Sequence, residues 1–424
     1  MSESLTAARR PYRRELAAIF LVALALRIGY VAFQGFRLPP DTDSYRRIAD
    51  NLVSGQGYSL VPGVPTAYRP PAYPVFIALS KWLSGGYWAA IWGQCVLGAL
   101  VTVLAASLAR GLVGDLFALG AAAIVAVDPY LVAVCDTFMT EALFAFFVTA
   151  FFASLMRALA GGGILWHVLA AVIAALAFLT RPEFVSYIPV VVIALAVCAR
   201  RGLLSVTVFV LAFAVVASTW AVRNGISMGR PILTTTHGGY THRLPYNYIL
   251  YDRVVMGGEV WDSGNRSLSE WQSRTGSETE AMTEVSRDGH NYRMADGFML
   301  ADARRAAVVA LYEAGSFWRL CPHGAAKTVN LALAAFFCVL AVLAVAGSVI
   351  AWRWGPFVRL AVWLLVLETV IHMYYWSNVR MRVPFHPLMA VAAAVAIAAM
   401  FRQKAFVNAA MAAVEKQPFC NPVS

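Results

Sequence analysis

The chain has 424 residues, of which 60% are hydrophobic and 13% are charged, and its formal net charge is +11. With a mean hydropathy of +0.65, this composition excludes an ordinary soluble globular protein and indicates a membrane protein. The excess positive charge does not indicate nucleic-acid binding, because many of the arginines stand at the ends of apolar runs, where they determine membrane topology.

Apolar runs of about 18–25 residues recur along the chain and are long enough to cross about 30 Å of hydrocarbon as helices. Ten spans are predicted, at 15–34, 87–109, 114–129, 137–156, 164–180, 184–199, 203–222, 326–351, 357–376 and 384–401. No small-residue cleavage site follows the basic N-terminus, so the first span is expected to be an uncleaved anchor.

Basic residues stand before the first span and at the end of each inward span, which predicts that both termini are cytoplasmic. These residues are Arg9, Arg10, Arg13, Arg14, Arg110, Arg157, Arg200, Arg201, Arg353, Arg402 and Lys404. The expected class is an all-α polytopic membrane protein. Its predicted parts are an N-terminal tail at 1–14, a transmembrane core at 15–222 with a first outer loop at 35–86, an outer loop domain at 223–325, C-terminal spans at 326–402 and a cytoplasmic tail at 403–424.

Six cysteines lie mostly within or beside apolar runs, and their spacing matches neither a metal site nor a disulfide framework. We interpret them as small packing residues: Cys95, Cys135, Cys198, Cys321, Cys338 and Cys420. No metal-ligand spacing links the loop histidines either, which are His237, His242, His290 and His323.

The first outer loop opens with two carboxylates, Asp41 and Asp43, just outside the first span. Such a pair can supply a base, hold a metal ion or cap a helix. Residues 44–54 carry one apolar stripe and predict an amphipathic surface helix that either aspartate could cap. A second short apolar helix, at 75–83, is expected to begin at the preceding prolines.

Ionisable residues inside or beside the spans are functional candidates by default. For Arg27, in the first span, structural pairing and a substrate contact both remain open. Asp136 and Glu141 lie at the outer end of the fourth span, and on one helix their side chains would be about 140° apart. Glu368 and His372 share a helix face and are expected to pair.

The long segment at 223–325 contains too many aromatic residues for a disordered linker, so an ordered exterior domain is expected. Its stretch at 277–311 predicts two helices with a break near Asp288-Gly289.

Several short motifs follow one another in a recognisable order. They are Asp41-x-Asp43-x-Tyr45, Gly55-x-Gly57-Tyr58, Arg69-Pro70-Pro71-x-Tyr73-Pro74, Thr140-Glu141-Ala142-Leu143-Phe144, Leu179-Thr180-Arg181-Pro182, Trp220-x-x-Arg223-Asn224 and Arg380-x-Arg382-x-Pro384-x-x-Pro387. In this order the chain resembles glycosyltransferase family 39 of the GT-C superfamily, which includes protein O-mannosyltransferases and aminoarabinose lipid A transferases. The resemblance covers about 15–400.

The resemblance implies an inverting hexosyl- or pentosyltransferase that takes a sugar from a polyprenyl phosphate and passes it to a protein, lipid or glycan acceptor. By the family pattern Asp41 is the general base and Glu141 a second acidic site residue. Many members have a second acid directly after the first, whereas here Thr42 intervenes before Asp43. The division of work between the two aspartates, and a divalent cation (Mg or Mn) held between them, therefore stay open.

The leaving lipid phosphate calls for cationic side chains, and arginine binds phosphate oxygens bidentately. The candidates are Arg69, Lys81, Arg181, Arg223, Arg380 and Arg382, with interfacial snorkelling as the alternative. In an extended segment Arg380 and Arg382 would project to one side as a clamp. By the same resemblance, Tyr45, Tyr58, Tyr73 and His237 are expected to contact substrate.

The expected location is a bacterial inner membrane, with the site on the periplasmic or extracellular side among membrane lipids. A transporter or lipid flippase is the alternative, but it would place polar residues at the midplane on broken helices. A scaffold or receptor explains neither the surface helices nor the arginines.

Overall fold

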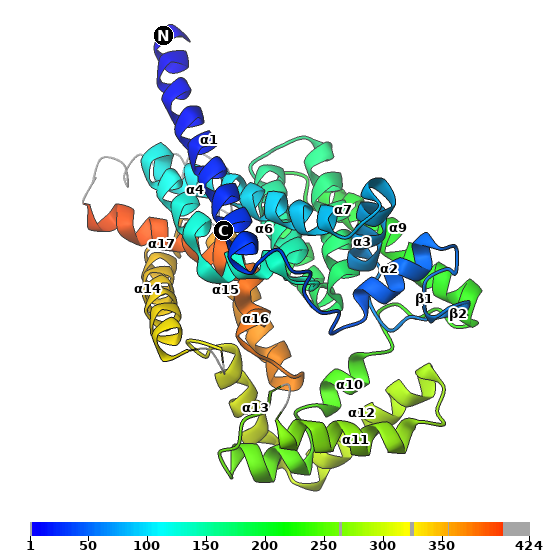
Figure 1. Ribbon diagram of the computed structural model, residues 1–424. Helices are drawn as coiled ribbons and strands as arrows, with labels where there is room; N and C mark the ends of the chain where they lie inside the picture. Colours follow the sequence, from blue (N-terminus) through cyan, green and yellow to red (C-terminus); the bar gives the residue numbers. More distant parts are fainter. Residues whose placement is uncertain (1, 263–264, 323–325, 355, 402–424) are drawn as a thin grey trace.

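The computed structural model describes residues 2–262, 265–322, 326–354 and 356–401. The predictions made for His323, Arg402, Lys404, Cys420 and the tail at 403–424 lie outside these residues. Figure 1 shows a helical bundle with a smaller helical layer attached at one end.

The bundle consists of long apolar helices, as the hydropathy pattern predicts. They are α1 (Ser2–Phe33), α4 (Trp88–Val127), α6 (Glu141–Leu159), α7 (Ile164–Thr180), α8 (Ile188–Cys198), α9 (Gly202–Met228), α14 (Lys327–Ala351), α15 (Pro356–Tyr374) and α17 (His386–Met400). Within the described residues, six segments are long and apolar enough to cross a membrane, counting α4 as one of them and α16 with α17 as another. Every predicted span has a helical counterpart, which confirms an all-α polytopic membrane protein.

The α4 segment contains two of the predicted spans rather than one long rod. Gly114 interrupts it with φ 75°, a left-handed conformation that glycine adopts without steric cost. The Arg27 side chain reaches both Gly98 and the carbonyl oxygens of Val125 and Ala126. In a straight helix Gly98 and Val125 would be about 40 Å apart, so the chain folds back near Gly114.

Burial separates central helices from peripheral ones. In α6 and in the 379–400 segment, 72% of the most apolar window is buried, whereas the corresponding value is 11% in α9. Apolar side chains on the outer surface of α9 and α14 therefore remain uncovered by protein, as lipid-facing positions require.

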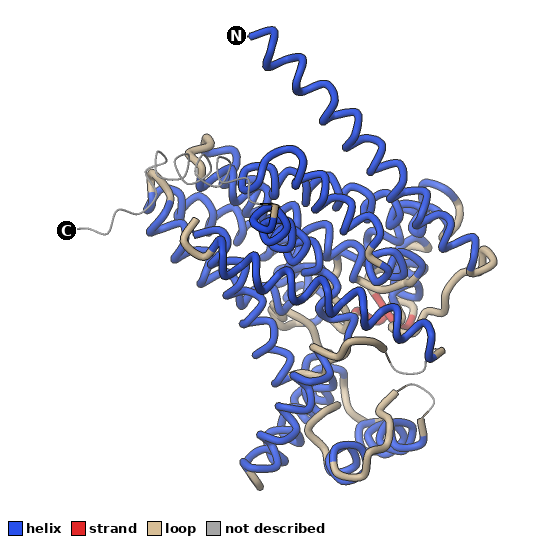
Figure 2. Tube along the Cα trace, turned by 90° about the vertical axis from the view of Figure 1, so that its left-hand side faces the viewer, coloured by secondary structure: helices blue, strands red, loops and turns tan. Residues whose placement is uncertain are grey.

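Short elements occupy the ends of the bundle that face the smaller layer. They are α2 (Tyr45–Val53), β1 (Ser59–Val61), β2 (Val64–Pro65), α3 (Ala72–Ser84), α5 (Pro129–Ala133), η1 (Val134–Asp136), η2 (Pro182–Tyr187), α16 (Val379–Arg382) and η4 (Val383–Phe385). The two strands form an antiparallel hairpin in which Ser59 pairs with Pro65. In Figure 2 these strands lie on the side of the bundle facing the smaller layer.

The smaller layer is ordered, and we call it the outer domain. It contains α10 (Gly238–Arg243), the π-helical turn η3 (Leu250–Val255), α11 (Arg266–Thr279), α12 (Glu284–Ala301) and α13 (Ala303–Phe317). Its core packs aromatic residues, including Trp261, Trp271 and Phe298. The predicted break near Asp288-Gly289 is wrong, because α12 continues through it. The helices break instead before Thr283 and at Asp302, whose side chains accept hydrogen bonds from the first turns of α12 and α13.

Two expectations about local geometry are also wrong. Arg380 and Arg382 do not lie on an extended segment, because Asn378 caps a helical turn at 379–382. Asp136 and Glu141 do not share a helix, since Asp136 ends η1 and Glu141 begins α6.

Candidate active site

Asp41 holds the start of α2, as predicted for one of the two aspartates. Its Oδ1 accepts a hydrogen bond from the Arg46 backbone N–H and its Oδ2 from that of Arg47, both at 3.0 Å. A carboxylate has about four acceptor positions, so each oxygen keeps a lone pair that can receive a proton. The cap therefore fixes the carboxylate without using up its basic capacity.

Asp43 is bound to Arg69, which lies two residues before Pro71, the N-cap of α3. Arg69 Nη2 lies 3.1 Å from Asp43 Oδ1, and Arg69 Nε donates to the Asp43 carbonyl oxygen at 3.0 Å. The guanidinium also lies 5.2 Å from the ring of Tyr45 and 4.9 Å from that of Tyr68. A divalent cation at Asp41 and Asp43 would have to displace this guanidinium. The described residues contain no group of three or more His, Cys, Asp or Glu side chains arranged to hold a metal ion.

The hairpin that follows α2 is fastened from two sides. Arg223, in the last turns of α9, donates to the carbonyl oxygens of Thr66 at 2.6 Å and Tyr58 at 2.7 Å. On the other side, Glu284 of the outer domain accepts from Thr66 Oγ1 at 2.6 Å and from the Ala67 N–H at 2.9 Å. Glu284 also accepts from Thr236. This carboxylate therefore joins the first outer loop to the outer domain.

Further contacts fix α2, α3 and the loop between them. Lys81 lies 2.6 Å from Asp50 on α2, and Tyr87 also donates to Asp50. Tyr73 donates to Gln94 Oε1 at 2.8 Å, and Tyr58 donates to the Arg69 carbonyl oxygen at 2.9 Å. The structure thus gives Lys81, Arg223, Tyr58 and Tyr73 protein partners that position the loop.

A second acidic centre lies where α6 begins and α7 ends, near α16. Arg181 Nη2 is 3.0 Å from Glu141 Oε1, and Arg181 Nε donates to Thr140 Oγ1 at 2.8 Å. Glu183 lies 3.7 Å from the same guanidinium, and Arg380 Nε lies 4.0 Å from Glu141. Glu141 is 2% exposed and its Oε2 has no hydrogen-bond partner among the described residues. Glu141 is therefore paired with the buried Arg181.

Tyr45 lies between the two centres. Burial raises the pKa of its hydroxyl to about 12, with opposing contributions from Arg69 and Arg181 and further increases from Asp43 and Glu141. Because these charges come from both ion pairs, the Tyr45 hydroxyl lies within the electrostatic range of each. It stays protonated at neutral pH and can donate a hydrogen bond.

Arg380 and Arg382 face different surroundings. The Arg380 side chain is 35% exposed and lies beside Glu141. Arg382 is fully buried, donates to the Phe317 carbonyl oxygen, and lies 3.5 Å above the Phe337 ring. The two residues therefore do not form one clamp, and Arg380 alone of the pair is open to solvent.

His237 lies between aromatic rings, with centroids 4.4 Å from Tyr68 and 5.0 Å from Tyr240. Burial lowers the pKa of its imidazole well below 6.5, and the nearby Arg69 lowers it further. His237 is therefore neutral at physiological pH, and its Nδ1 has no hydrogen-bond partner among the described residues.

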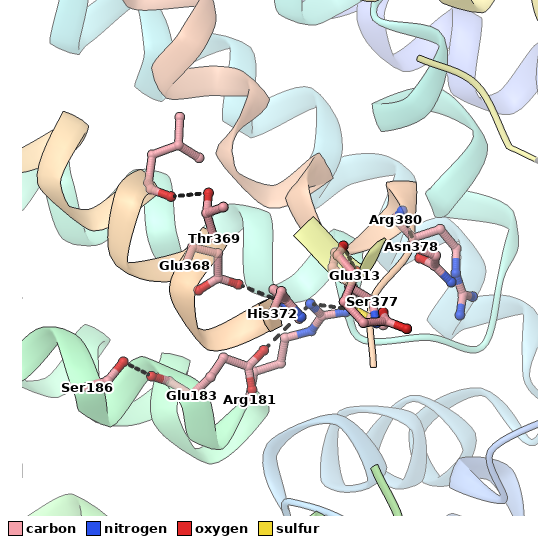
Figure 3. Close-up of polar contacts among 12 residues, drawn as sticks. Arg181, Glu183, Ser186, Glu313, Glu368, Thr369, His372, Ser377, Asn378 and Arg380 are labelled. Atoms are coloured by element: carbon pink, nitrogen blue, oxygen red, sulfur yellow. Dashed lines mark hydrogen bonds and ion pairs between the residues drawn. The ribbon is translucent and has the colours of Figure 1, made fainter. Parts of the chain in front are cut away.

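Sequence reasoning did not single out two further acids near this site, Glu183 and Glu313. Figure 3 shows Glu183 beside Arg181, and Glu313 with Ser377, Asn378 and Arg380. Glu183 follows the Arg181-Pro182 motif directly, which was an available signal. Glu313 had no such signal, because its helix approaches Arg380 only through the tertiary fold. The expected Glu368–His372 pair is present at 3.1 Å.

Comparison with known proteins identifies the fold. Residues 68–222 match the family model described as dolichyl-phosphate-mannose-protein mannosyltransferase. The chain superposes on the crystal structure of the Archaeoglobus fulgidus oligosaccharyltransferase in the apo form with a TM-score of 0.54 and 14% identity, over 96% of this chain and 54% of that one. The fold is that of the GT-C glycosyltransferases.

Two other structures give similar results. The same oligosaccharyltransferase tethered to an acceptor peptide matches with a TM-score of 0.53 and 12% identity, over 96% of this chain and 53% of that one. ArnT from Cupriavidus metallidurans, bound to undecaprenyl phosphate, matches with a TM-score of 0.42 and 13% identity, over 94% of this chain and 78% of that one. No curated protein sequence matches significantly. The chain spans about half the length of the oligosaccharyltransferase.

Proposed function

We propose that this protein is a membrane glycosyltransferase that moves a sugar from a polyprenyl phosphate to an acceptor hydroxyl on the outer face of the membrane. One observation carries the proposal. A fixed carboxylate, Asp41, lies on the same outer loop as the Asp43–Arg69 pair, and the Arg69 guanidinium lies 5.2 Å from the Tyr45 ring. These groups gather at one end of the bundle, as an enzyme acting on a lipid-linked donor requires.

In the proposed reaction the acceptor oxygen attacks the anomeric carbon while Asp41 takes its proton. The bond from the anomeric carbon to the phosphate oxygen breaks, and its electrons leave with the polyprenyl phosphate. Attack from the face opposite the leaving group inverts the anomeric configuration. Asp43 remains paired with Arg69 and holds the loop in place.

Arg380 is the proposed main contact for the donor phosphate, because its guanidinium is partly exposed and has only a distant carboxylate neighbour. The positive charge of Arg181 is compensated by the carboxylates of Glu141 and Glu183. Arg181 therefore supplies the donor phosphate with hydrogen bonds but with less net positive charge than Arg380. Charge-assisted hydrogen bonds from arginine stabilise the negative charge that develops on the leaving phosphate.

The structural neighbours support a lipid-linked donor. The archaeal oligosaccharyltransferase has been determined in complex with an inhibitory peptide and a dolichol-phosphate, and the match to this chain has a TM-score of 0.50. We infer that this chain also uses a polyprenyl-phosphate donor, because its arginines at the outer face can bind a phosphate. A periplasmic or extracellular orientation follows from the predicted topology.

The direct test is the Asp41→Asn variant. Asparagine caps a helix about as well as aspartate, so folding and donor binding should stay nearly unchanged. Loss of the proton acceptor should lower transfer on the order of 10²–10⁴-fold, the usual contribution of a positioned base. Single-turnover transfer by the purified variant with its co-purified lipid donor bound measures this.

Asp43→Asn is the matched control, and it should cost less than Asp41→Asn because Asp43 pairs with Arg69. If a cation joins the two aspartates, both variants should fail together and a chelator should silence the wild type. Near-normal transfer by Asp41→Asn would reduce Asp41 to a helix cap and move the base to Asp43 or Glu141.

A further inference from the structure

A polar cavity of about 200 Å³ lies between the outer domain and the bundle, beside Arg380. Its wall includes Trp261, Tyr312, Glu313, Ser316 and Trp376. The cavity is small and suits a compact ligand such as one sugar ring. Glu313, Ser377, Asn378 and Arg380, which Figure 3 shows, also line the cavity.

One buried polar group in the wall lacks a partner and indicates a ligand, and a second is a buried carboxyl. Trp261 is 7% exposed, and its Nε1 has no hydrogen-bond partner among the described residues. Such unsatisfied buried donors are rare in native structures and require an explanation. Glu313 is 1% exposed and receives the Ser377 N–H on Oε2 at 2.7 Å.

The wall offers hydrogen-bonding groups and aromatic faces that suit a hydroxyl-rich ligand. Its charged residues are two arginines, Arg319 and Arg380, and two acids, Asp262 and Glu313. Burial raises the pKa of Glu313 to about 8, so this carboxyl is protonated at neutral pH and can donate a hydrogen bond. The aromatic faces carry negative charge density that attracts the C–H face of a sugar ring.

We propose that this cavity binds a single sugar ring, and that in the proposed glycosyl transfer it receives the sugar attached to the donor phosphate. The claim that the bound ring is the sugar of the lipid donor rests on the proposed function. Arg380 connects the two places, since its side chain lines the cavity and also lies 4.0 Å from Glu141. A phosphate bound by Arg380 would therefore direct its attached sugar toward Trp261 and Glu313. A sugar ring of a glycan acceptor would have the same chemistry. The experiment below distinguishes a donor sugar from an acceptor sugar.

The test compares the binding of undecaprenyl phosphate with that of the same lipid carrying mannose, glucose or N-acetylglucosamine. Free methyl glycosides of the three sugars form a second arm, read by saturation-transfer NMR. Two variants alter the cavity: Tyr312→Phe removes a hydroxyl from its wall, and Ser316→Leu fills it. Tyr248→Phe and Ser273→Leu are matched controls in the outer domain, because both positions are exposed and lie outside the cavity wall.

For a donor-sugar site, the wild type should bind at least one of the sugar-bearing lipids more tightly than the bare lipid. Tyr312→Phe should remove about fivefold of this preference, as the loss of one hydrogen bond implies, and Ser316→Leu should abolish it. Affinity for bare undecaprenyl phosphate should stay unchanged in both variants, which also shows that they fold. If the variants lose only the methyl glycoside signal, the ring belongs to the acceptor.

Sugar-lipid and glycoside binding that is unchanged in both variants would overturn the sugar site while leaving the proposed function intact. Conversely, a wild type that binds none of the lipids but loses its glycoside signal in the variants would contradict the lipid-donor function and retain the sugar site. A wild type that binds neither lipids nor glycosides would overturn both.

Discussion

Each arginine at the outer end of the bundle has its own set of acceptors, and these acceptors distinguish positions that look alike in sequence. Arg69, Arg181 and Arg223 are held by carboxylates or backbone carbonyl oxygens. Arg380 has no carboxylate closer than 4.0 Å among the described residues. A guanidinium with its hydrogen-bond donors still available can bind phosphate at a smaller desolvation cost than one already paired.

We therefore expect Arg380→Ala to weaken binding of undecaprenyl phosphate by about 1.5–3 kcal/mol, the range for hydrogen bonds to charged groups. The measurement is the dissociation constant of the purified protein, with Arg37→Ala as an exposed control at the outer face. Arg382→Ala should instead lower thermal stability, because this residue is fully buried against Phe337. Equal affinity losses in the Arg380 and Arg382 variants would restore the two-arginine clamp.

Glu313 provides a pH-dependent test of the outer domain. Burial raises its pKa to about 8 in the folded protein, against about 4.3 in an unfolded chain. Between these values the folded state binds more protons than the unfolded state, so this contribution to stability falls as pH rises. Glu313→Gln, which stays neutral, should remove that dependence.

The measurement is the thermal unfolding temperature of both proteins from about pH 5 to about pH 9. The wild type should lose stability relative to Glu313→Gln as pH increases across this range. Parallel curves would show that Glu313 is ionised in the folded protein despite its burial.

At the scale of elements, the hairpin of the first outer loop depends on contacts from distant parts of the chain. The Glu284 carboxylate accepts three hydrogen bonds, from Thr66, Ala67 and Thr236. A two-stranded hairpin is marginally stable alone, so these contacts from the outer domain help to keep Arg69 and Asp43 in position.

Glu284→Ala should therefore increase amide hydrogen exchange across residues 58–69. A local loss of about 1.5–3 kcal/mol, typical of hydrogen bonds to a charged group, corresponds to at least tenfold faster exchange. Glu280→Ala, at an exposed position near the end of α11, is the control. Unchanged exchange in the hairpin would mean that Arg223 alone holds it.

The elements that the sequence predicts correctly are those with strong local signals. The spans follow from apolar length, and α2 follows from its stripe and its capping aspartate. The backbone conformation at Arg380 was predicted wrongly. An extended segment was expected, but Asn378 caps a helical turn there. The break near Asp288-Gly289 was also wrong. Asp288 there accepts a hydrogen bond from the Gly239 N–H across the outer domain, and α12 continues.

The site was only partly predictable, since its partners come from tertiary contacts. The motif residues Arg181 and Glu141 were singled out separately, but nothing local pairs them at 3.0 Å. Glu284 and Glu313 likewise acquire their roles from residues 218 and 64 positions away in the chain. Sequence motifs identify such residues without giving their partners, because two residues distant in sequence meet only once the bundle has assembled.

At the scale of the whole molecule, the outer domain lies at one end of the bundle (Figure 1). The peripheral helices of the bundle expose apolar side chains, and polar contacts join the first outer loop to the outer domain. This distribution fits a protein surrounded by lipid with one reactive face. A transporter would require its polar groups near the membrane midplane on interrupted helices. The proposed enzyme requires them where a lipid headgroup and an acceptor can meet.

The sidedness of that face can be tested with single cysteines. Ser277 is an exposed residue of α11 in the outer domain, and Arg201 is an exposed residue immediately before α9. The 27 residues of α9 separate these two regions, and at 1.5 Å per residue such a helix is about 40 Å long, enough to cross a membrane. Positive residues at 200–201 favour the cytoplasmic side for that end.

Ser277→Cys should therefore react with a membrane-impermeant maleimide in intact cells, whereas Arg201→Cys should react only after permeabilisation. Reactivity above that of the parent chain, which has six cysteines of its own, is the quantity to compare. A cysteine at Ser277 preserves α11, which an inserted tag would interrupt. Labelling of Ser277→Cys only in inverted vesicles would place the outer domain, and with it Asp41 and Arg380, on the cytoplasmic side. Transfer from an outer-leaflet donor would then be impossible.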